Sequence, residues 1–341
     1  MFSALIEKLQ RRQDLSVDEA SAAMTEIMEG RAVPAQIAGL LIALAMKGER
    51  PAEVVGLARV MRAKATPLST SPGEVFDTCG TGGDRAHTFN VSTVAALVVS
   101  ACGVRVAKHG NRSVSSRCGS ADLFEALGVN ISASPAVVEK CLSDAGIAFF
   151  FAPTFHPSMR HAGPTRKELG VRTAFNLLGP LTNPAGASRQ LVGVPRPELT
   201  ELVARSLGLL GSKRAWVVHG ADGLDEISTT GYTKVSELRD GAVNTFYLHP
   251  GDAGLPKAAP EALRGGEAAE NARVATTILS GEKGPARDIV LLNAGASLLI
   301  AGAAATIADG IARAGQAIDS GDARRVLDRL ATISNAAPEA A

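Results

Sequence analysis

The chain has 341 residues, of which 46% are hydrophobic and 4% aromatic, and its formal net charge is +1 at neutral pH. This length allows a sizeable core and two domains. The balanced charge excludes a global field that would recruit nucleic acid or a membrane surface. Even the most apolar stretch, 291–305, is too short to span a bilayer. The four cysteines lack C-x-x-C spacing, so we expect reduced thiols and a cytoplasmic protein.

The first 65 residues predict helices packed on one another. Ser16 opens a capping box, and Pro34 and Pro51 each stand near a helix start. The apolar stripes that follow must be covered by the rest of the chain or by a second subunit. We therefore expect an N-terminal helical domain, 1–70, that ends in a linker at 66–73.

From residue 71 to 335 the pattern changes to alternating strands and helices. This alternation predicts an α/β fold with a central, mainly parallel sheet. Strands are expected at 75–78, 104–107, 147–151, 190–194 and 215–219, with two or three further β segments in 231–249 and helices in 267–335.

A glycine-rich loop joins the first of these strands to a helix that starts near Ser92. Gly80, Gly82 and Gly83 let the backbone turn and let an anion approach its amides, and the helix start adds free N–H groups. The loop matches neither G-x-x-x-x-G-K-[ST] nor G-x-G-x-x-G, so a tight strand–helix turn is the alternative. The polar residues that follow suit a sugar and its pyrophosphate: Asp84, Thr88, Asn90, Ser92 and Thr93.

A basic loop at 108–122 follows the second predicted strand, which we expect to end at Lys108. It contains three cations and several serines, which favours a second phosphate cradle over a solvated basic loop. His109 is a candidate general base or a structural, hydrogen-bonding histidine.

Two later stretches also carry chemistry. His156, Arg160 and Arg166 lie among prolines, and one of the arginines could hold the carboxylate of an acidic aromatic substrate, the alternative being surface arginines. Asp225 and Glu226 are adjacent carboxylates after a strand and suit magnesium, which takes one or two protein carboxylates, although Asp222 and Asp225 could simply form the loop.

These stretches together resemble the anthranilate phosphoribosyltransferase family. The family's signatures are present across most of the chain as Gly80-Thr-Gly-Gly-Asp84, Asn90-Val-Ser-Thr93, Lys108-His-Gly-Asn-Arg112, Gly119-Ser-Ala-Asp122, Asn176-Leu-Leu-Gly-Pro180 and Asp222-Gly-Leu-Asp-Glu226. One residue departs from the pattern, because Arg85 stands where the family usually has glycine.

The resemblance implies binding sites for 5-phosphoribosyl-1-pyrophosphate (PRPP), anthranilate and two Mg²⁺ ions per subunit. Anthranilate would be held by Gly80, Asn111 and Arg166, with Arg166, Asn111 and Lys108 as the catalytic residues. The magnesium ligands would be Ser92, Asp225 and Glu226. PRPP would be bound by Gly80, Gly83, Asp84, Thr88, Asn90, Val91, Ser92, Thr93, Lys108, His109, Gly110, Asn111, Arg112, Ser113, Val114, Ser115, Ser116 and Ser120.

The resemblance also implies a fold and a reaction. The helical domain would be completed by a segment near 165–188, and a homodimer would form through the N-terminal helices. The enzyme would transfer the phosphoribosyl group to the amine of anthranilate, giving N-(5-phosphoribosyl)anthranilate and pyrophosphate, the second step of tryptophan biosynthesis from chorismate. We expect a dissociative displacement without a covalent intermediate, and no nucleic-acid or membrane partner. A pyrimidine nucleoside phosphorylase and a nucleic-acid-binding paralogue are the alternatives, which the Lys108 loop, Arg166 and Asn111 disfavour.

Overall fold

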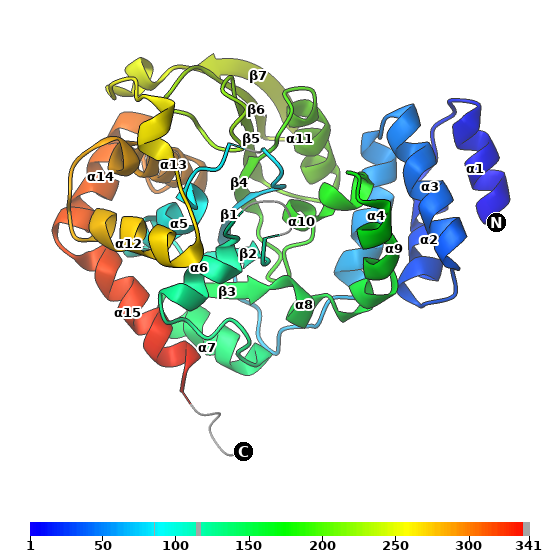
Figure 1. Ribbon diagram of the computed structural model, residues 1–341, viewed down its shortest axis with the longest axis horizontal. Helices are drawn as coiled ribbons and strands as arrows, with labels where there is room; N and C mark the ends of the chain where they lie inside the picture. The colour runs from blue at the N-terminus through cyan, green and yellow to red at the C-terminus, as the bar shows by residue number, and fades with distance from the viewer. Residues whose placement is uncertain (85, 114–116, 337–341) are drawn as a thin grey trace.

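The computed structural model describes residues 1–84, 86–113 and 117–336 (Figure 1). The sequence-based expectations for Arg85, Val114, Ser115 and Ser116 lie outside these described residues.

The N-terminal domain is a helical bundle. Its helices are α1 (Phe2–Gln10), α2 (Val17–Met28), α3 (Pro34–Lys47) and α4 (Pro51–Ala63). The predicted capping box at Ser16 is confirmed, because the Ser16 hydroxyl accepts from the Glu19 amide at 3.1 Å and the Glu19 carboxylate accepts from the Ser16 amide at 2.8 Å. Apolar residues on the inward faces of α2, α3 and α4 are almost fully buried.

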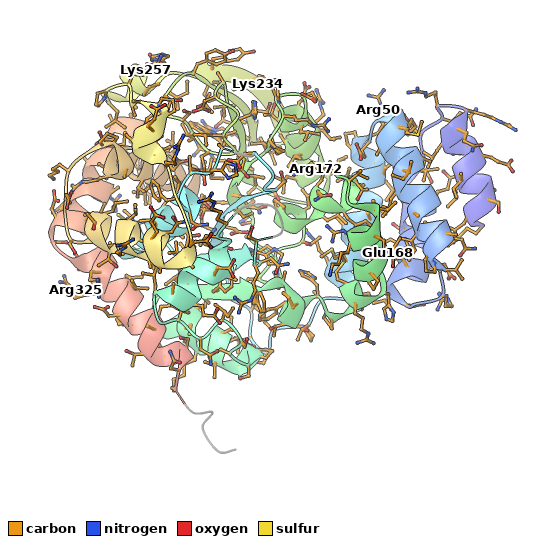
Figure 2. All side chains as sticks on the ribbon, in the orientation of Figure 1. Arg50, Glu168, Arg172, Lys234, Lys257 and Arg325 are labelled. Atoms are coloured by element: carbon orange, nitrogen blue, oxygen red, sulfur yellow. The ribbon has the colours of Figure 1, made fainter. Side chains whose placement is uncertain are left out.

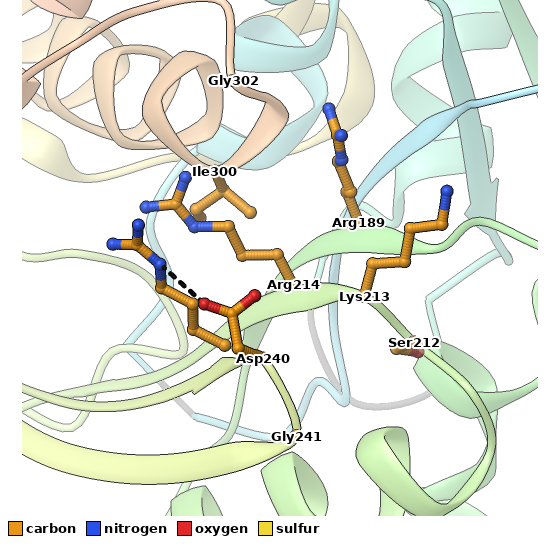
Figure 3. A pocket seen from close by; sticks show the side chains of 9 residues that line it. Arg189, Ser212, Lys213, Arg214, Asp240, Gly241, Ile300 and Gly302 are labelled. Atoms are coloured by element: carbon orange, nitrogen blue, oxygen red, sulfur yellow. Dashed lines mark ion pairs between the residues drawn. The ribbon is translucent and has the colours of Figure 1, made fainter.

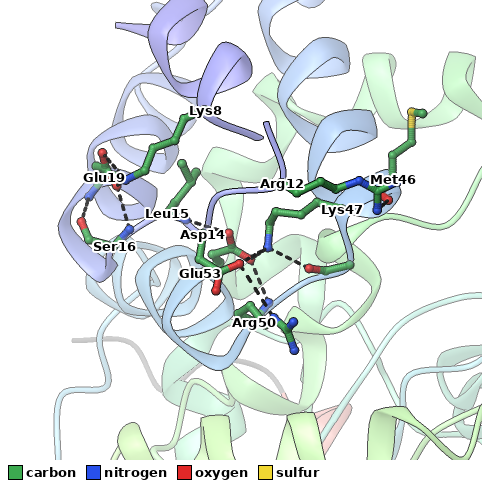
Figure 4. Close-up of polar contacts among 11 residues, drawn as sticks. Lys8, Arg12, Asp14, Leu15, Ser16, Glu19, Met46, Lys47, Arg50 and Glu53 are labelled. Carbon is green, nitrogen blue, oxygen red and sulfur yellow. Dashed lines mark hydrogen bonds and ion pairs between the residues drawn. The ribbon is translucent and has the colours of Figure 1, made fainter. Parts of the chain in front are cut away.

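A buried ion pair fastens the start of α4 to the end of α3 (Figure 4). The Glu53 carboxylate accepts from the backbone amides of Leu15 and Arg50 at 2.9 and 2.8 Å. Lys47 lies 3.0 Å from Glu53 and 2.7 Å from Asp14. The side chains of Lys47 and Glu53 are only 3% and 1% exposed, so their pairing, together with these other hydrogen bonds, compensates for lost water.

The larger domain is built on a seven-stranded sheet of order β3-β2-β1-β4-β5-β6-β7. The first five strands in sequence are parallel, and β6 and β7 are antiparallel additions, so the predicted mainly parallel sheet is confirmed. The strands are β1 (Phe76–Gly80), β2 (Val106–Gly110), β3 (Ile147–Phe151), β4 (Arg189–Gly193), β5 (Arg214–Gly220), β6 (Thr233–Arg239) and β7 (Ala242–Leu248).

The expected ends of the first two strands are wrong, since β1 continues to Gly80 instead of ending at residue 78. The second strand continues past Lys108 to Gly110, because Lys108, His109 and Gly110 pair in register with Phe149, Phe150 and Phe151 of β3. Lys108 and His109 therefore lie inside the sheet, where their side chains are buried, rather than in the loop that follows it.

Helices lie on both sides of the sheet (Figure 1), and its two faces belong to two hydrophobic cores. Trp216 and Val218 of β5 pack in the core that α5 (Val91–Ala101) and α13 (Pro285–Ala301) share. The alternating residues Ala215 and Val217 join the core that contains α11 (Leu199–Leu209) and the N-terminal helices. The helical domain thus packs, through α4, on α11, which covers this face of the sheet.

The other helices connect and cover these layers. The helices after β2 and β3 are α6 (Ser120–Ala126), α7 (Pro135–Asp144), α8 (Ala152–Phe155), α9 (Gly163–Leu169) and α10 (Leu178–Leu181), with short 3-10 turns at Pro157–His161 and Ala174–Asn176. The later helices are α12 (Ala268–Leu279), α14 (Ile307–Asp319) and α15 (Asp322–Ser334), with 3-10 turns at Pro250–Ala253 and Pro260–Leu263. Figure 1 shows α9 lying beside the N-terminal helices, and it contacts α3. Within the described residues, no helix has the length and apolar character needed to cross a bilayer.

Candidate active site

The strand order reverses at β1, and most of the predicted site residues gather there. The chain leaves β1 for β2 and β3 on one side and returns to β4 on the other. Open α/β sheets bind ligands at the carboxyl ends of their strands at such a switch point. The loops after β1, β2, β4 and β5 all leave the sheet at this edge.

Two glycines at this edge make room for Asp225. Gly80 ends β1 and pairs in register with Gly193, which ends β4. A Cβ atom on Gly80 would lie 2.2 Å from Asp225 Oδ2, and a Cβ on Gly193 would lie 1.6 Å from the Asp225 carbonyl oxygen. Neither strand end could carry a side chain without displacing Asp225.

The glycine loop is anchored to both neighbours of β1. The Gly82 amide donates to Asp225 Oδ2 at 3.0 Å, and the Thr81 amide donates to the Gly193 carbonyl at 2.9 Å. Gly82 and Gly83 have φ of 64° and 81°, the left-handed region that glycine adopts without strain. Among the described residues, the amides of Gly83 and Asp84 have no acceptor. These two donors are available to an anion.

Glu226 lies beneath the start of α5. Its carboxylate accepts from the Ser92 amide at 3.0 Å. The Asn293 side chain fixes the next residue by exchanging two hydrogen bonds with the backbone of Ile227, at 3.0 and 2.9 Å. Within the described part of the chain, the Ser92 hydroxyl has no partner.

The electrostatics at Asp225 and Glu226 favour a cation. Burial raises the pKa of Asp225, and the nearby Asp84 charge raises it further. Burial likewise raises the pKa of Glu226, and the Asp225 charge adds to the shift. No group of three acidic, histidine or cysteine side chains that could hold one ion occurs in the described ranges. This arrangement suits magnesium, which takes one or two protein carboxylates and leaves its other positions to phosphate and water.

Lys108 lies behind this site, buried in β2. Its side chain is about 1% exposed, and its ammonium donates to the carbonyl of Thr78 in β1. Its charge opposes the burial-driven rise in the pKa of both Asp77 and Glu226. Asp77 is held by the Asn183 amide group at 2.8 Å and by the His109 backbone amide at 3.1 Å. Because Lys108 is buried, it influences the carboxyl-end edge of the sheet through its positive charge and not through an exposed ammonium group.

His109 and His156 form a buried pair with ring centroids 5.2 Å apart. Burial lowers the pKa of His109 to about 3 and that of His156 to about 4. His109 Nδ1 also lies 3.0 Å from the Gly179 carbonyl, which fixes the ring. Both rings are neutral at pH 7, and for His109 the geometry favours the structural alternative over the general base.

The loop after β2 is organised by Asp122. This carboxylate accepts from the amides of Ser113 and Gly119 at 3.0 and 2.8 Å and pairs with Arg112 at 2.8 Å. Arg112 also pairs with Glu125, so its guanidinium is shared between two carboxylates. Ser120 lies 3.4 Å from the Asn111 carbonyl, close to Gly110.

Asn90 ties this loop to the glycine loop. Its amide group donates to the Cys118 carbonyl at 2.9 Å, and its oxygen accepts from Asn271 at 3.0 Å. Thr88 forms an isolated antiparallel bridge with Arg264. Val91 and Thr93 are buried in the first turn of α5. Asn90 and Thr88 thus shape the site through contacts with other loops.

Arg166 is the arginine best placed to bind a carboxylate. It lies in α9 with its guanidinium 5.2 Å from the centroid of the Phe175 ring. Burial lowers the Arg166 pKa, yet no described residue forms an ion pair or hydrogen bond with its guanidinium. Arg160, the other candidate, is exposed. The Asp222 carboxylate accepts from the Ser228 and Thr230 hydroxyls, which is the loop-forming role.

A hollow of about 490 Å³ lies at the opposite, amino-terminal edge of the strands (Figure 3). Arg189 and Arg214 line it, and both donate to carbonyls at the end of α13. Lys213 pairs with Glu74 at 2.5 Å, and Arg239 lies 3.5 Å from Asp240. The cations that line this hollow are already paired, and the hollow lies at the edge of the sheet opposite the switch point. We therefore assign its residues a structural role, which is to hold the end of α13.

Comparison with known proteins identifies the family. Residues 72–324 match the a/b domain of a glycosyl transferase family, and residues 3–65 match its helical bundle domain. An anthranilate phosphoribosyltransferase of Moorella thermoacetica is 56% identical over 330 residues, covering 97% of each chain. The crystal structure of the Thermus thermophilus enzyme of that name has a TM-score of 0.91 at 45% identity, covering 97% of this chain and 99% of its own. The Saccharomyces cerevisiae enzyme in complex with PRPP and Mg has a TM-score of 0.88 at 29% identity, covering 98% of this chain and 97% of its own.

The fold and site therefore define a glycosyl transferase with separate helical and α/β domains. The chain belongs to the anthranilate phosphoribosyltransferase family.

Sequence reasoning missed three residues that shape the site: Gly193, Asn271 and Arg172, whose guanidinium donates to the Gly82 carbonyl. Gly193 is needed only because β4 pairs with β1 beside Asp225. Asn271 meets Asn90 across 181 residues of chain. No local pattern signals such contacts, although a glycine at the carboxyl end of a predicted strand could have drawn attention to Gly193.

Proposed function

We propose that this chain transfers the phosphoribosyl group of PRPP to the amine of anthranilate, giving N-(5-phosphoribosyl)anthranilate and pyrophosphate. One observation carries the proposal: the free loop amides at Gly83 and Asp84 lie beside the acidic pair Asp225–Glu226, and the unpaired Arg166 guanidinium belongs to the same segment as Arg172, which contacts this loop. A diphosphate with its metal and a carboxylate-bearing acceptor would satisfy all three features. The Saccharomyces cerevisiae relative supports the donor, since it has been solved with PRPP and Mg.

The donor and its metal would occupy the β1–α5 side of the site. We infer that the Gly83 and Asp84 amides, the start of α5 and the loop after β2 hold the phosphates of PRPP. Ser92, Asp225 and Glu226 would hold two Mg²⁺ ions per subunit, and the unpartnered Ser92 hydroxyl and the repelling carboxylates fit that role. Bound magnesium would supply positive charge to the departing pyrophosphate.

The acceptor would lie on the α9 side. Arg166 would pair with the anthranilate carboxylate through its planar guanidinium, and Gly80 and Asn111 would line the same pocket. The Phe175 ring beneath Arg166 holds the guanidinium in place at little cost in entropy.

The chemistry needs positioning more than acid–base help. The aniline-type amine of anthranilate is already neutral at pH 7, so its lone pair is free to attack C1 of the ribose. The neutral His109–His156 pair is consistent with a site that lacks a strong base. We infer a dissociative displacement in line, with inversion at C1 and no covalent intermediate. Lys108 would contribute through its charge behind Glu226.

We also infer a cytoplasmic homodimer whose subunits meet through the N-terminal helices. Val33 caps the start of α3 and Met46 lies in its last turn, and these residues are 53% and 72% exposed. The four free cysteines suit a reducing compartment. The domain limits would be 1–70 and 71–335, with a segment near 165–188 joining the helical domain, as the packing of α9 on α3 suggests.

The test is the loss of anthranilate fluorescence over time with PRPP and magnesium present. Controls omit each component in turn and include an Arg166→Ala variant. We expect a loss that needs PRPP, magnesium and Arg166. A folded protein that leaves anthranilate unchanged would contradict the proposal and direct assays to nucleoside phosphorolysis and nucleic-acid binding.

A further inference from the structure

Arg172 reaches from the helical side of the molecule to the glycine loop. It follows Arg166 by six residues, just beyond Gly170, whose φ of 63° ends α9. Its Nη1 donates to the Gly82 carbonyl at 2.7 Å, and its Nη2 lies 3.4 Å from the Thr81 carbonyl. Figure 2 shows Arg172 between the helical domain and the strands.

The loop is built around this side chain. A Cβ atom on Gly83 would lie 1.8 Å from Arg172 Nη1, so a larger residue there would displace the guanidinium. Arg172 therefore holds the carbonyl side of Gly82 while Asp225 holds its amide. The same peptide segment is fixed from two opposite sides.

The charge of Arg172 also faces the acidic residues of the site. Arg172 is exposed by its surface area, but partial desolvation lowers its pKa, and Asp225 and Asp84 act in the opposite direction. Hydrogen bonds from a charged donor are stronger than those between neutral groups. A loop containing two adjacent glycines loses much conformational entropy when it is ordered. Arg172 offsets that loss before a ligand arrives.

We propose that Arg172 is a positioning residue that fixes the glycine loop so that the free amides of Gly83 and Asp84 can bind the diphosphate of PRPP. The inference rests on the proposed function, because it concerns the donor of that reaction. It predicts an effect on the donor, whereas Arg166 governs the acceptor.

The test compares Arg172→Met and Arg172→Lys with the unmodified enzyme. We expect Arg172→Met to raise the KM for PRPP about 10- to 100-fold and to leave the KM for anthranilate nearly unchanged. Arg172→Lys keeps the charge but loses the two-pronged contact, so it should recover only part of the affinity. Isothermal titration with PRPP and magnesium, without anthranilate, measures donor binding separately from turnover.

Amide hydrogen exchange without ligands tests whether Arg172 orders the glycine loop itself or acts only by direct contact with PRPP. The amides of Thr81 and Gly82 are hydrogen-bonded in the empty site, and we expect them to exchange faster in Arg172→Met. Arg196→Met is the matched control, because Arg196 is close enough to influence the Arg172 pKa but pairs with Glu198 at 3.5 Å.

Each outcome is decisive. An unchanged KM for PRPP in Arg172→Met overturns the inference, and so does unchanged exchange at Thr81 and Gly82. Equal effects of Arg196→Met would overturn the inference by assigning the result to net charge, and faster exchange across the whole chain would overturn it by assigning the result to general destabilisation. If the unmodified protein transfers nothing to anthranilate, the proposed function fails first, and that result is separate from the behaviour of the variants.

Discussion

At the scale of single residues, the site is defined by polar groups that lack protein partners. The Arg166 guanidinium pairs with nothing that the structure describes and rests on Phe175. A partly buried cation without a counter-ion is costly. Its persistence in a protein of balanced charge is explained if the substrate supplies the anion.

Arg166→Lys tests this explanation. Lysine keeps the charge but cannot form a bidentate pair with a carboxylate or stack equally well on Phe175. We expect the KM for anthranilate to rise about 10- to 100-fold, with a much smaller change in the KM for PRPP. Steady-state kinetics with each substrate varied in turn measures both. The exposed Arg160→Lys is the control, and the same loss in that variant would contradict the assignment.

The buried histidine pair predicts a pH dependence of stability. Because the folded-state pKa of His156 is depressed to about 4 from an ordinary 6.5, the unfolded state binds an additional proton between these values. The stability that neutral His156 contributes is present above pH 6.5 and is lost as the pH falls toward 4. Over that window the free energy of unfolding of the native chain should fall about 1.4 kcal/mol per pH unit more steeply than that of His156→Phe. Urea unfolding of both proteins at several pH values gives the difference, and parallel curves would show that His156 is not buried neutral.

At the scale of elements, the site depends on strand ends that carry no side chains. Gly80 and Gly193 are register partners, and together they leave the space that Asp225 fills. Asp225 and Glu226, which follow β5, are therefore positioned by the pairing of β1 with β4, and β1 lies far earlier in the chain.

Gly193→Ala should disturb metal binding. The added methyl group would lie 1.6 Å from the Asp225 carbonyl oxygen, so the loop after β5 must shift. We expect the Mg²⁺ concentration needed for half-maximal activity to rise, together with a loss of more than about tenfold in kcat/KM. Magnesium titration of the initial rate measures both effects. Gly251→Ala is the control, since its nearest neighbouring atom would be 3.7 Å away, and an unaltered magnesium titration in Gly193→Ala would refute the expectation.

Within the helical domain, the pair Lys47–Glu53 carries stability. Glu53→Ala would leave the Lys47 ammonium without its buried partner and two backbone amides without an acceptor. We expect a loss of about 3–5 kcal/mol in the free energy of unfolding. Asp14→Ala removes the 54% exposed partner of the same lysine and should cost at most about 1 kcal/mol. Thermal unfolding of the two variants makes the comparison, and equal losses would contradict the assignment of the stability to the buried pair.

At the scale of the whole molecule, the fold class followed from the sequence because its signals are local. The capping box at Ser16, the alternation of strands and helices, and the glycine loop after β1 all depend on neighbours in the chain. The strand order did not follow from them, and neither did the continuation of β2 through Lys108, which depends on pairing with Phe149 of β3.

The candidate site, like the fold, could be predicted only where its signals are local in the sequence. Asp225–Glu226 and Arg166 stand in motifs that suggest their chemistry, whereas Arg172 and Asn271 gain their roles only from contacts across the fold. Arg172 touches a loop 90 residues earlier in the chain, so no spacing rule could have identified it. The helices, the sheet and the crossing segment must be assembled before that contact exists.

The most direct test of the account is phosphorus NMR of the reaction mixture, recorded while anthranilate fluorescence is followed in the same sample. Direct transfer predicts one pyrophosphate and one N-(5-phosphoribosyl)anthranilate for each anthranilate consumed, with no ribose 5-phosphate. Pyrophosphate released without loss of anthranilate, or loss of anthranilate without pyrophosphate, would contradict the proposed transfer at this site.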